Sequence, residues 1–110
     1  MEELINKIVK IAENLDWSVN VNNNELEFTK YSPAGQDFNF NVTGDDLEEV
    51  IKSIDEYCNN FDCSEETYLW LDNTGHGTNG SPYDMKDLYE DMEECLKMIE
   101  ELRDELKTLL

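Results

Sequence analysis

Carboxylates dominate the chemically active side chains of this sequence, and they are densest between residues 87 and 105. Nine lie off the apolar positions of that segment: Asp87, Glu90, Asp91, Glu93, Glu94, Glu100, Glu101, Asp104 and Glu105. If the segment is helical, successive turns rise about 5.4 Å, close to the roughly 6–7 Å between neighbouring phosphates of a DNA strand. Such a helix would present carboxylates at a phosphate-like pitch to a basic protein surface.

This segment is therefore predicted to bind a partner protein. The residues assigned to that surface are Asp87, Glu90, Asp91, Glu94, Glu101, Asp104 and Glu105. The shortage of lysines at i,i+4 from these acids favours the assignment, because an ordinary solvated helix face mixes both signs. The alternative is a helix whose acidic face is only solvated.

Cysteine and histidine offer a second kind of chemistry. Cys58, Cys63, Cys95 and His76 are zinc-ligand types, but Cys95 falls on a predicted core position and free buried cysteines are common. A Cys63–His76 thiol–imidazole pair has no sequence feature that brings the two side chains together. Residues 72–77 vaguely resemble a calcium-binding loop, but acids are missing at its third and fifth positions and Tyr83 replaces the glutamate of its twelfth position. We expect no metal, no cofactor, no catalytic residue and no enzymatic activity.

The N-terminal part of the chain must supply a scaffold for the acidic segment. Apolar residues at helical spacing predict an amphipathic helix over residues 2–15. Three stretches of alternating apolar residues follow, centred on Val19, Phe28 and Phe40, with turn-forming residues at 22–24 and 32–35 between them. This pattern predicts a three-stranded antiparallel meander with one apolar face.

The C-terminal part is predicted to be helical. Thr43 is a candidate N-cap for a helix that reaches Phe61, and residues 64–71 favour a short helix over a short strand. The loop over residues 72–82 is longer than most connectors, which leaves either a connecting or a recognition role open. Ser81 and Pro82 then open a helix with a heptad of apolar residues: Leu88, Met92, Cys95, Ile99, Leu102, Leu106 and Leu109.

That last helix would be about 42 Å long, whereas a core of this size spans roughly 26 Å. We therefore expect the helix to overhang the core, to pair with a second long helix or to pair with another chain. The fold class predicted for the whole chain is α+β. Residues 1–110 are expected to form a single acidic domain with an N-terminal helix, a meander and then two or three helices, the last of them long.

Composition narrows the function classes. The 110 residues include 27 Asp and Glu against eight Lys and Arg, a net charge of −19, which argues against direct binding to nucleic acid or anionic membranes. The 27 Leu, Ile, Val and Phe residues favour a folded chain. No apolar run is long enough for a membrane span, and the N-terminus does not resemble a signal peptide. We expect a cytoplasmic location in a bacterial host, with reduced thiols. Solubility or a high-salt host is the alternative reason for the charge.

The order of a helix, a three-stranded meander and further helices, together with the acidic bias, resembles small type II-A anti-CRISPR proteins. Residues 32–38 and 79–82 are similar to segments of small phage and mobile-element proteins. The first resemblance implies a DNA mimic that blocks the PAM-reading cleft of a type II CRISPR nuclease, a basic nucleic-acid-binding protein. The alternative function is a structural module whose C-terminal heptad helix forms a coiled coil with a second copy or with a basic partner.

Overall fold

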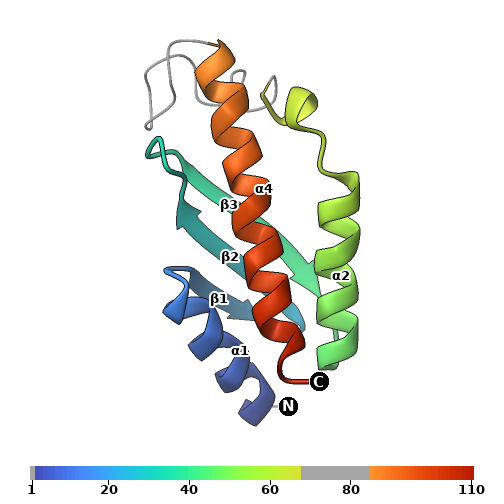
Figure 1. Cartoon of the computed structure of the whole chain (residues 1–110). Coiled ribbons are helices and arrows are strands. Elements are labelled where there is room, and N and C mark those ends of the chain that lie inside the picture. The colour runs from blue at the N-terminus through green and yellow to red at the C-terminus, as the bar shows by residue number, and fades with distance from the viewer. Residues whose placement is uncertain (1, 68–84) are drawn as a thin grey trace.

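The computed structural model describes residues 2–67 and 85–110 (Figure 1). The elements are α1 (Glu2–Asn14), β1 (Ser18–Asn22), β2 (Glu25–Tyr31), β3 (Asp37–Thr43), α2 (Leu47–Asn60) and α4 (Met85–Lys107). Residues 63–67 are also helical. The predicted α+β fold, with an N-terminal helix, a meander and a long final helix, is confirmed.

The three strands form an antiparallel meander in the order β1-β2-β3. Asn23 has a φ of 57° in the turn between β1 and β2, a conformation that asparagine tolerates better than most residues. One face of the sheet is apolar, and its buried side chains are Leu26, Phe28, Phe38, Phe40 and Val42. The residues between them, such as Asn39 and Asn41, are exposed.

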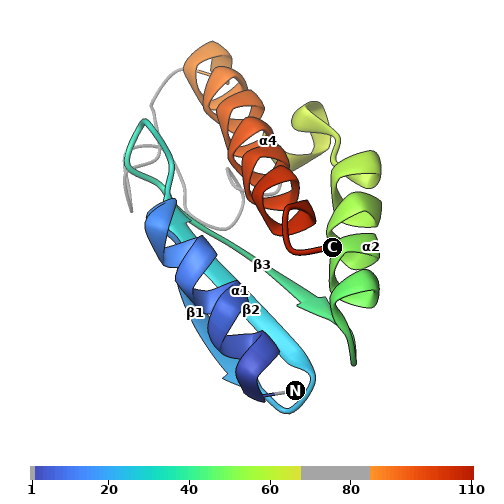
Figure 2. The same cartoon turned by 60° about the horizontal axis from the view of Figure 1, so that its bottom comes forward.

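The helices α1, α2 and α4 lie on the apolar side of the sheet. Figures 1 and 2 show α4 running along the sheet, with α1 on one side of it and α2 on the other. Aromatic rings fill the space beneath the helices: Trp17 meets Phe40 edge-on at 5.5 Å between centroids, and Tyr57 of α2 stacks on Phe40 at 4.9 Å. These contacts join the sheet to α2 and complete the core.

The heptad seam of α4 is packed inside the molecule. Its members Leu88, Met92, Cys95, Ile99, Leu102 and Leu106 are all 0% exposed. The 23-residue helix is about 34 Å long and fits within the 42 Å long axis of the molecule. In the described part of the chain, the expectation that this helix overhangs its core is therefore wrong, because the core is elongated along it.

The start of α2 also differs from the prediction. Asp46 is the N-cap, and its carboxylate accepts a hydrogen bond from the Glu49 backbone N–H at 2.8 Å. The Glu49 side chain accepts one from the Asp45 N–H at 2.7 Å, which completes a capping arrangement. Thr43 is not the cap because it still belongs to β3, paired with Glu25. The predicted start of the last helix at Ser81 and Pro82, the apolar segment 69–71 and the loop 72–82 lie outside the described residues.

Candidate functional site: the acidic face of α4

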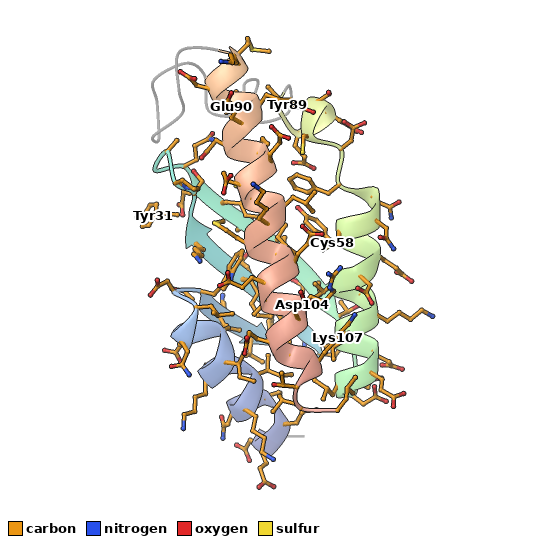
Figure 3. All side chains as sticks on the ribbon, in the orientation of Figure 1. Tyr31, Cys58, Tyr89, Glu90, Asp104 and Lys107 are labelled. Carbon is orange, nitrogen blue, oxygen red and sulfur yellow. The ribbon has the colours of Figure 1, made fainter. Side chains whose placement is uncertain are left out.

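Five carboxylates form what we call the α4 acidic face: Asp87, Glu90, Glu94, Glu101 and Glu105. All five residues are exposed. At about 100° per residue they fall within an arc of roughly 60°, on the side of the helix turned away from the buried seam. From first to last they span about 27 Å along the axis. Figure 3 shows Glu90 near the start of this helix.

Lysines compensate part of this face. Lys86 Nζ lies 3.6 Å from Glu90 Oε1, and Lys97 Nζ lies 3.0 Å from Glu94 Oε1. The bond to Glu94 raises the pKa of Lys97. The shortage of lysines at i,i+4 is therefore incomplete, because Lys86 pairs with Glu90 at that spacing, while Lys97 pairs with Glu94 at i,i+3. Within the described residues, Asp87, Glu101 and Glu105 make no ion pair.

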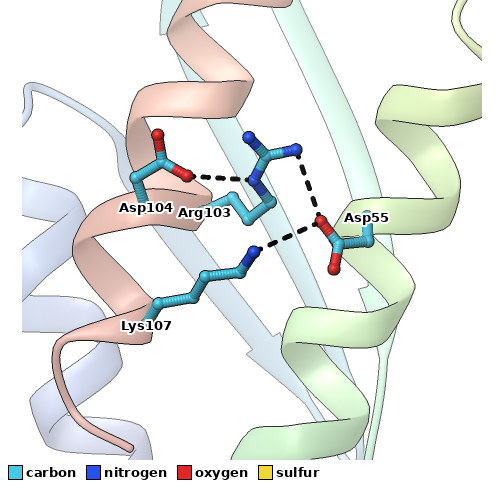
Figure 4. A network of polar contacts seen from close by, with 4 residues as sticks. All are labelled: Asp55, Arg103, Asp104 and Lys107. Atoms are coloured by element: carbon cyan, nitrogen blue, oxygen red, sulfur yellow. Dashed lines mark hydrogen bonds and ion pairs between the residues drawn. The ribbon is translucent and has the colours of Figure 1, made fainter.

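Asp104 belongs to a different group of charges. Its Oδ1 lies 3.1 Å from Arg103 Nε, while Arg103 Nη1 lies 3.3 Å from Asp55 Oδ1 on α2. Lys107 Nζ lies 3.9 Å from the same Asp55 oxygen (Figure 4). This cluster joins α4 to α2, so Asp104 has a local partner even though its side chain is 65% exposed.

Asp91, which the sequence assigned to the partner-binding surface, does not lie on the exposed surface of α4. It is only 4% exposed. Its carboxylate accepts hydrogen bonds from Ser32 Oγ at 2.5 Å, from the Ala34 N–H at 2.9 Å and from Gln36 Nε2 at 2.6 Å. These donors all belong to the β2–β3 loop, so Asp91 fastens that loop to α4. A buried carboxylate needs such donors because leaving water is costly.

A shallow groove of about 460 Å³ is lined by the β2–β3 loop and by α4. Pro33 and Ala34 supply its loop side, and α4 supplies its helix side with five acids and one base: Asp87, Glu90, Asp91, Glu93, Glu94 and Lys97. A short apolar surface beside carboxylates suits the stem and head of an arginine or lysine side chain. The groove therefore extends the α4 acidic face toward the sheet.

The cysteines lie in surroundings that disfavour thiolates. Burial raises the pKa of Cys95, and the nearby Asp91 carboxylate acts in the same direction. Burial also raises the pKa values of Cys58 and Cys63. Within residues 2–67 and 85–110, no group of three or more Cys, His, Asp or Glu side chains is arranged to hold a metal ion. The candidate pairing of Cys63 with His76 lies partly outside the described residues.

Comparison with models of protein families, with curated proteins and with solved structures found no match. Among the described residues, no helix combines the length and apolar character needed to cross a membrane.

Proposed function

We propose that this protein is a nucleic-acid mimic that binds the DNA-binding cleft of a basic protein, a type II CRISPR nuclease, in the bacterial cytoplasm. The observation that carries the proposal is the geometry of the α4 acidic face. Five carboxylates line one side of a single helix over about 27 Å, and the opposite side is anchored throughout by fully buried residues. A helix held in this way keeps its charges in place before binding, which lowers the entropic cost of docking.

The mechanism is competition for basic residues. Lysine and arginine side chains that bind DNA phosphates would pair with these carboxylates, and the protein would exclude the DNA while doing so. Association of oppositely charged surfaces is fast at low salt and is screened as salt rises. Most of the carboxylates without an ion pair among the described residues lie in the C-terminal half of the face, at Glu101 and Glu105. This half should therefore contribute most to the binding affinity.

The coiled-coil alternative receives less support. Six of the seven heptad residues, from Leu88 to Leu106, are fully buried against this chain's own sheet and helices, and Leu109 is partly buried. Forming a coiled coil through them would require α4 to leave the core, which exposes apolar area worth about 1.5–3 kcal/mol for each large side chain.

The test is a competition assay with a guide-loaded type II CRISPR nuclease and labelled DNA that contains its PAM. DNA binding is followed by fluorescence anisotropy while the protein is titrated in, at about 50 and 200 mM salt. We expect loss of DNA binding near stoichiometric protein, with relief at the higher salt.

Two double variants with the same change in net charge locate the surface. Glu101→Lys with Glu105→Lys should abolish inhibition. Glu13→Lys with Glu65→Lys, at exposed positions outside α4, should retain most of it. Equal loss in both variants would mean that only the total charge matters. No inhibition by the unmodified protein at large excess would refute this nuclease as the target.

A further inference from the structure

Within the described residues, the outer edge of β3 leaves backbone hydrogen-bonding groups without partners. Gly44 N–H donates to the Asn24 carbonyl at 3.2 Å, which fixes the alternation of the β2–β3 ladder. Phe38, Phe40 and Val42 then direct their backbone groups toward β2, whereas Asp37, Asn39 and Asn41 direct theirs outward. In the described part of the chain no hydrogen bond takes these outward groups. Thr43 is the exception, because its carbonyl accepts from Ser53 Oγ at 2.7 Å.

The strand β3 itself has few of the residue and register features that usually protect edge strands. The seven residues of β3 pair with β2 in continuous register, without a bulge. They include no proline and no lysine, and Asp37 at one end is their only charged residue. Natural edge strands generally use such features to prevent pairing with another chain, so their absence here marks the strand as open to addition.

A groove of about 310 Å³ runs beside the same edge, and we call it the β3 groove. Asn41, Val42 and Thr43 line it from β3, and Ser53, Glu56, Tyr57 and Asn60 line it from α2. Figure 1 shows β3 as the strand nearest to α2. A strand added to β3 would therefore place alternate side chains against α2.

We infer that β3 accepts an extended, basic segment of a partner protein as a fourth strand, with its side chains in the β3 groove. The charge around the edge selects this occupant. Glu56 in the groove makes no ion pair within the described residues, and Asp37 lies at the start of the edge. A second copy of this chain is a poor occupant because each copy carries a net charge of −19. Main-chain hydrogen bonds would supply the affinity of such an addition, and the side-chain contacts its specificity.

The probe for this site is a fluorescent seven-residue peptide of alternating lysine and valine. A peptide of the same sequence with every backbone N–H methylated keeps the charge and removes the donors. We expect the first peptide to bind and the second to bind at least about tenfold more weakly, a difference equal to one hydrogen bond to the backbone. Equal binding of both peptides would show simple charge attraction and would overturn the inference.

A proline scan distinguishes this edge from the other. Asn39→Pro removes an outward N–H and leaves the ladder to β2 intact, as proline does on natural edge strands. Val21→Pro is the matched control, because Val21 has the corresponding outward position on β1. We expect the first variant to lose peptide binding and the second to keep it. Equal weakening in both variants would contradict the inference.

Amide exchange of the unmodified protein provides a readout that does not depend on the folding of a variant. The Asn39 and Asn41 amides should exchange faster than those of Phe38 and Phe40, and should slow when the peptide is added. Protection of all four amides in the free protein would show that the edge is already covered. The Glu101→Lys, Glu105→Lys variant should bind the peptide normally, so failure of the proposed function and failure of this inference are separable.

Discussion

Replacing Asp91 with alanine should destabilise the protein far more than replacing any carboxylate of the α4 acidic face. The substitution removes the acceptor for three donors of the β2–β3 loop at once: Ser32 Oγ, Ala34 N–H and Gln36 Nε2. Ser32 and Gln36 are themselves buried, at 4% and 0% exposed. Their donors would lose a charged acceptor in a place that water reaches poorly.

The expected loss of stability in Asp91→Ala follows from the hydrogen bonds that are removed. A hydrogen bond to a charged group contributes about 1.5–3 kcal/mol, and three such bonds are not additive because they share one carboxylate. Asp91 borders the groove beside the β2–β3 loop, so water can replace part of what is lost. We expect a loss of about 3 kcal/mol in the free energy of unfolding, which lowers the melting temperature by roughly 12 °C in a domain of this size.

Asp91→Asn distinguishes the loss of the carboxylate's hydrogen bonds from the loss of its volume, which alanine also removes. The amide keeps the shape but turns one oxygen into a donor. Gln36 is able to compensate, because its buried Oε1 has no hydrogen-bond partner among the described residues and rotation of its amide would present that oxygen as an acceptor. We therefore expect a loss of only about 1 kcal/mol, comparable to one neutral hydrogen bond.

Urea unfolding followed by circular dichroism measures all three proteins, with Glu101→Ala as a surface control that should change stability by less than about 0.5 kcal/mol. If Asp91→Ala were no worse than the control, the carboxylate would not be holding the loop. If Asp91→Asn kept full stability but lost inhibition of the nuclease, Asp91 would be a docking residue after all.

Two further predictions concern α2 and the core. Arg103→Ala and Asp55→Ala should each lower the free energy of unfolding by up to about 1 kcal/mol, because the ion pair between them is partly exposed. A double-mutant cycle should give a coupling energy of about 0.5–1 kcal/mol. A coupling energy of zero would show that this ion pair does not stabilise the contact between α2 and α4. Cys95 should react with Ellman's reagent far more slowly in the folded protein than in urea, and equal reaction rates in the two states would contradict its burial. Because burial raises the pKa of Cys95, the free energy of unfolding should fall as the pH rises above about 9, where the unfolded thiol ionises and the folded one does not.

The sequence carried most of the information about the fold. Alternation around Phe28 and Phe40 predicts strands that share one apolar face, and turn residues such as Asn23 separate them. Helical spacing predicts α1, α2 and α4 in the same direct way. The position of the α2 cap was missed because Thr43 and Asp46 are both good N-caps, and only pairing with Glu25 shows that Thr43 remains in the sheet.

The candidate site was harder to predict. A heptad seam is narrower than the apolar stripe of a helix that packs on a sheet between two other helices. Asp91 lies three residues after Leu88 and four before Cys95, inside that wider stripe, so its burial was visible in the spacing. Its donors lie 55 to 59 residues earlier in the chain, and no local pattern reveals a pairing over that distance. The repeated apolar residues of α4 likewise do not distinguish an intramolecular partner from a second chain.

The position of α4 in the chain has a consequence for biosynthesis. The sheet is complete at Thr43, but the helix that covers its apolar face ends 64 residues later, at Lys107. At about 5–20 residues per second a ribosome needs roughly 3–13 s to synthesise that interval. During this time Phe28, Phe38 and Phe40 lack much of their cover. Nascent chains that all carry strong negative charge repel one another, so the same acids that we propose for binding would also keep half-made copies from aggregating.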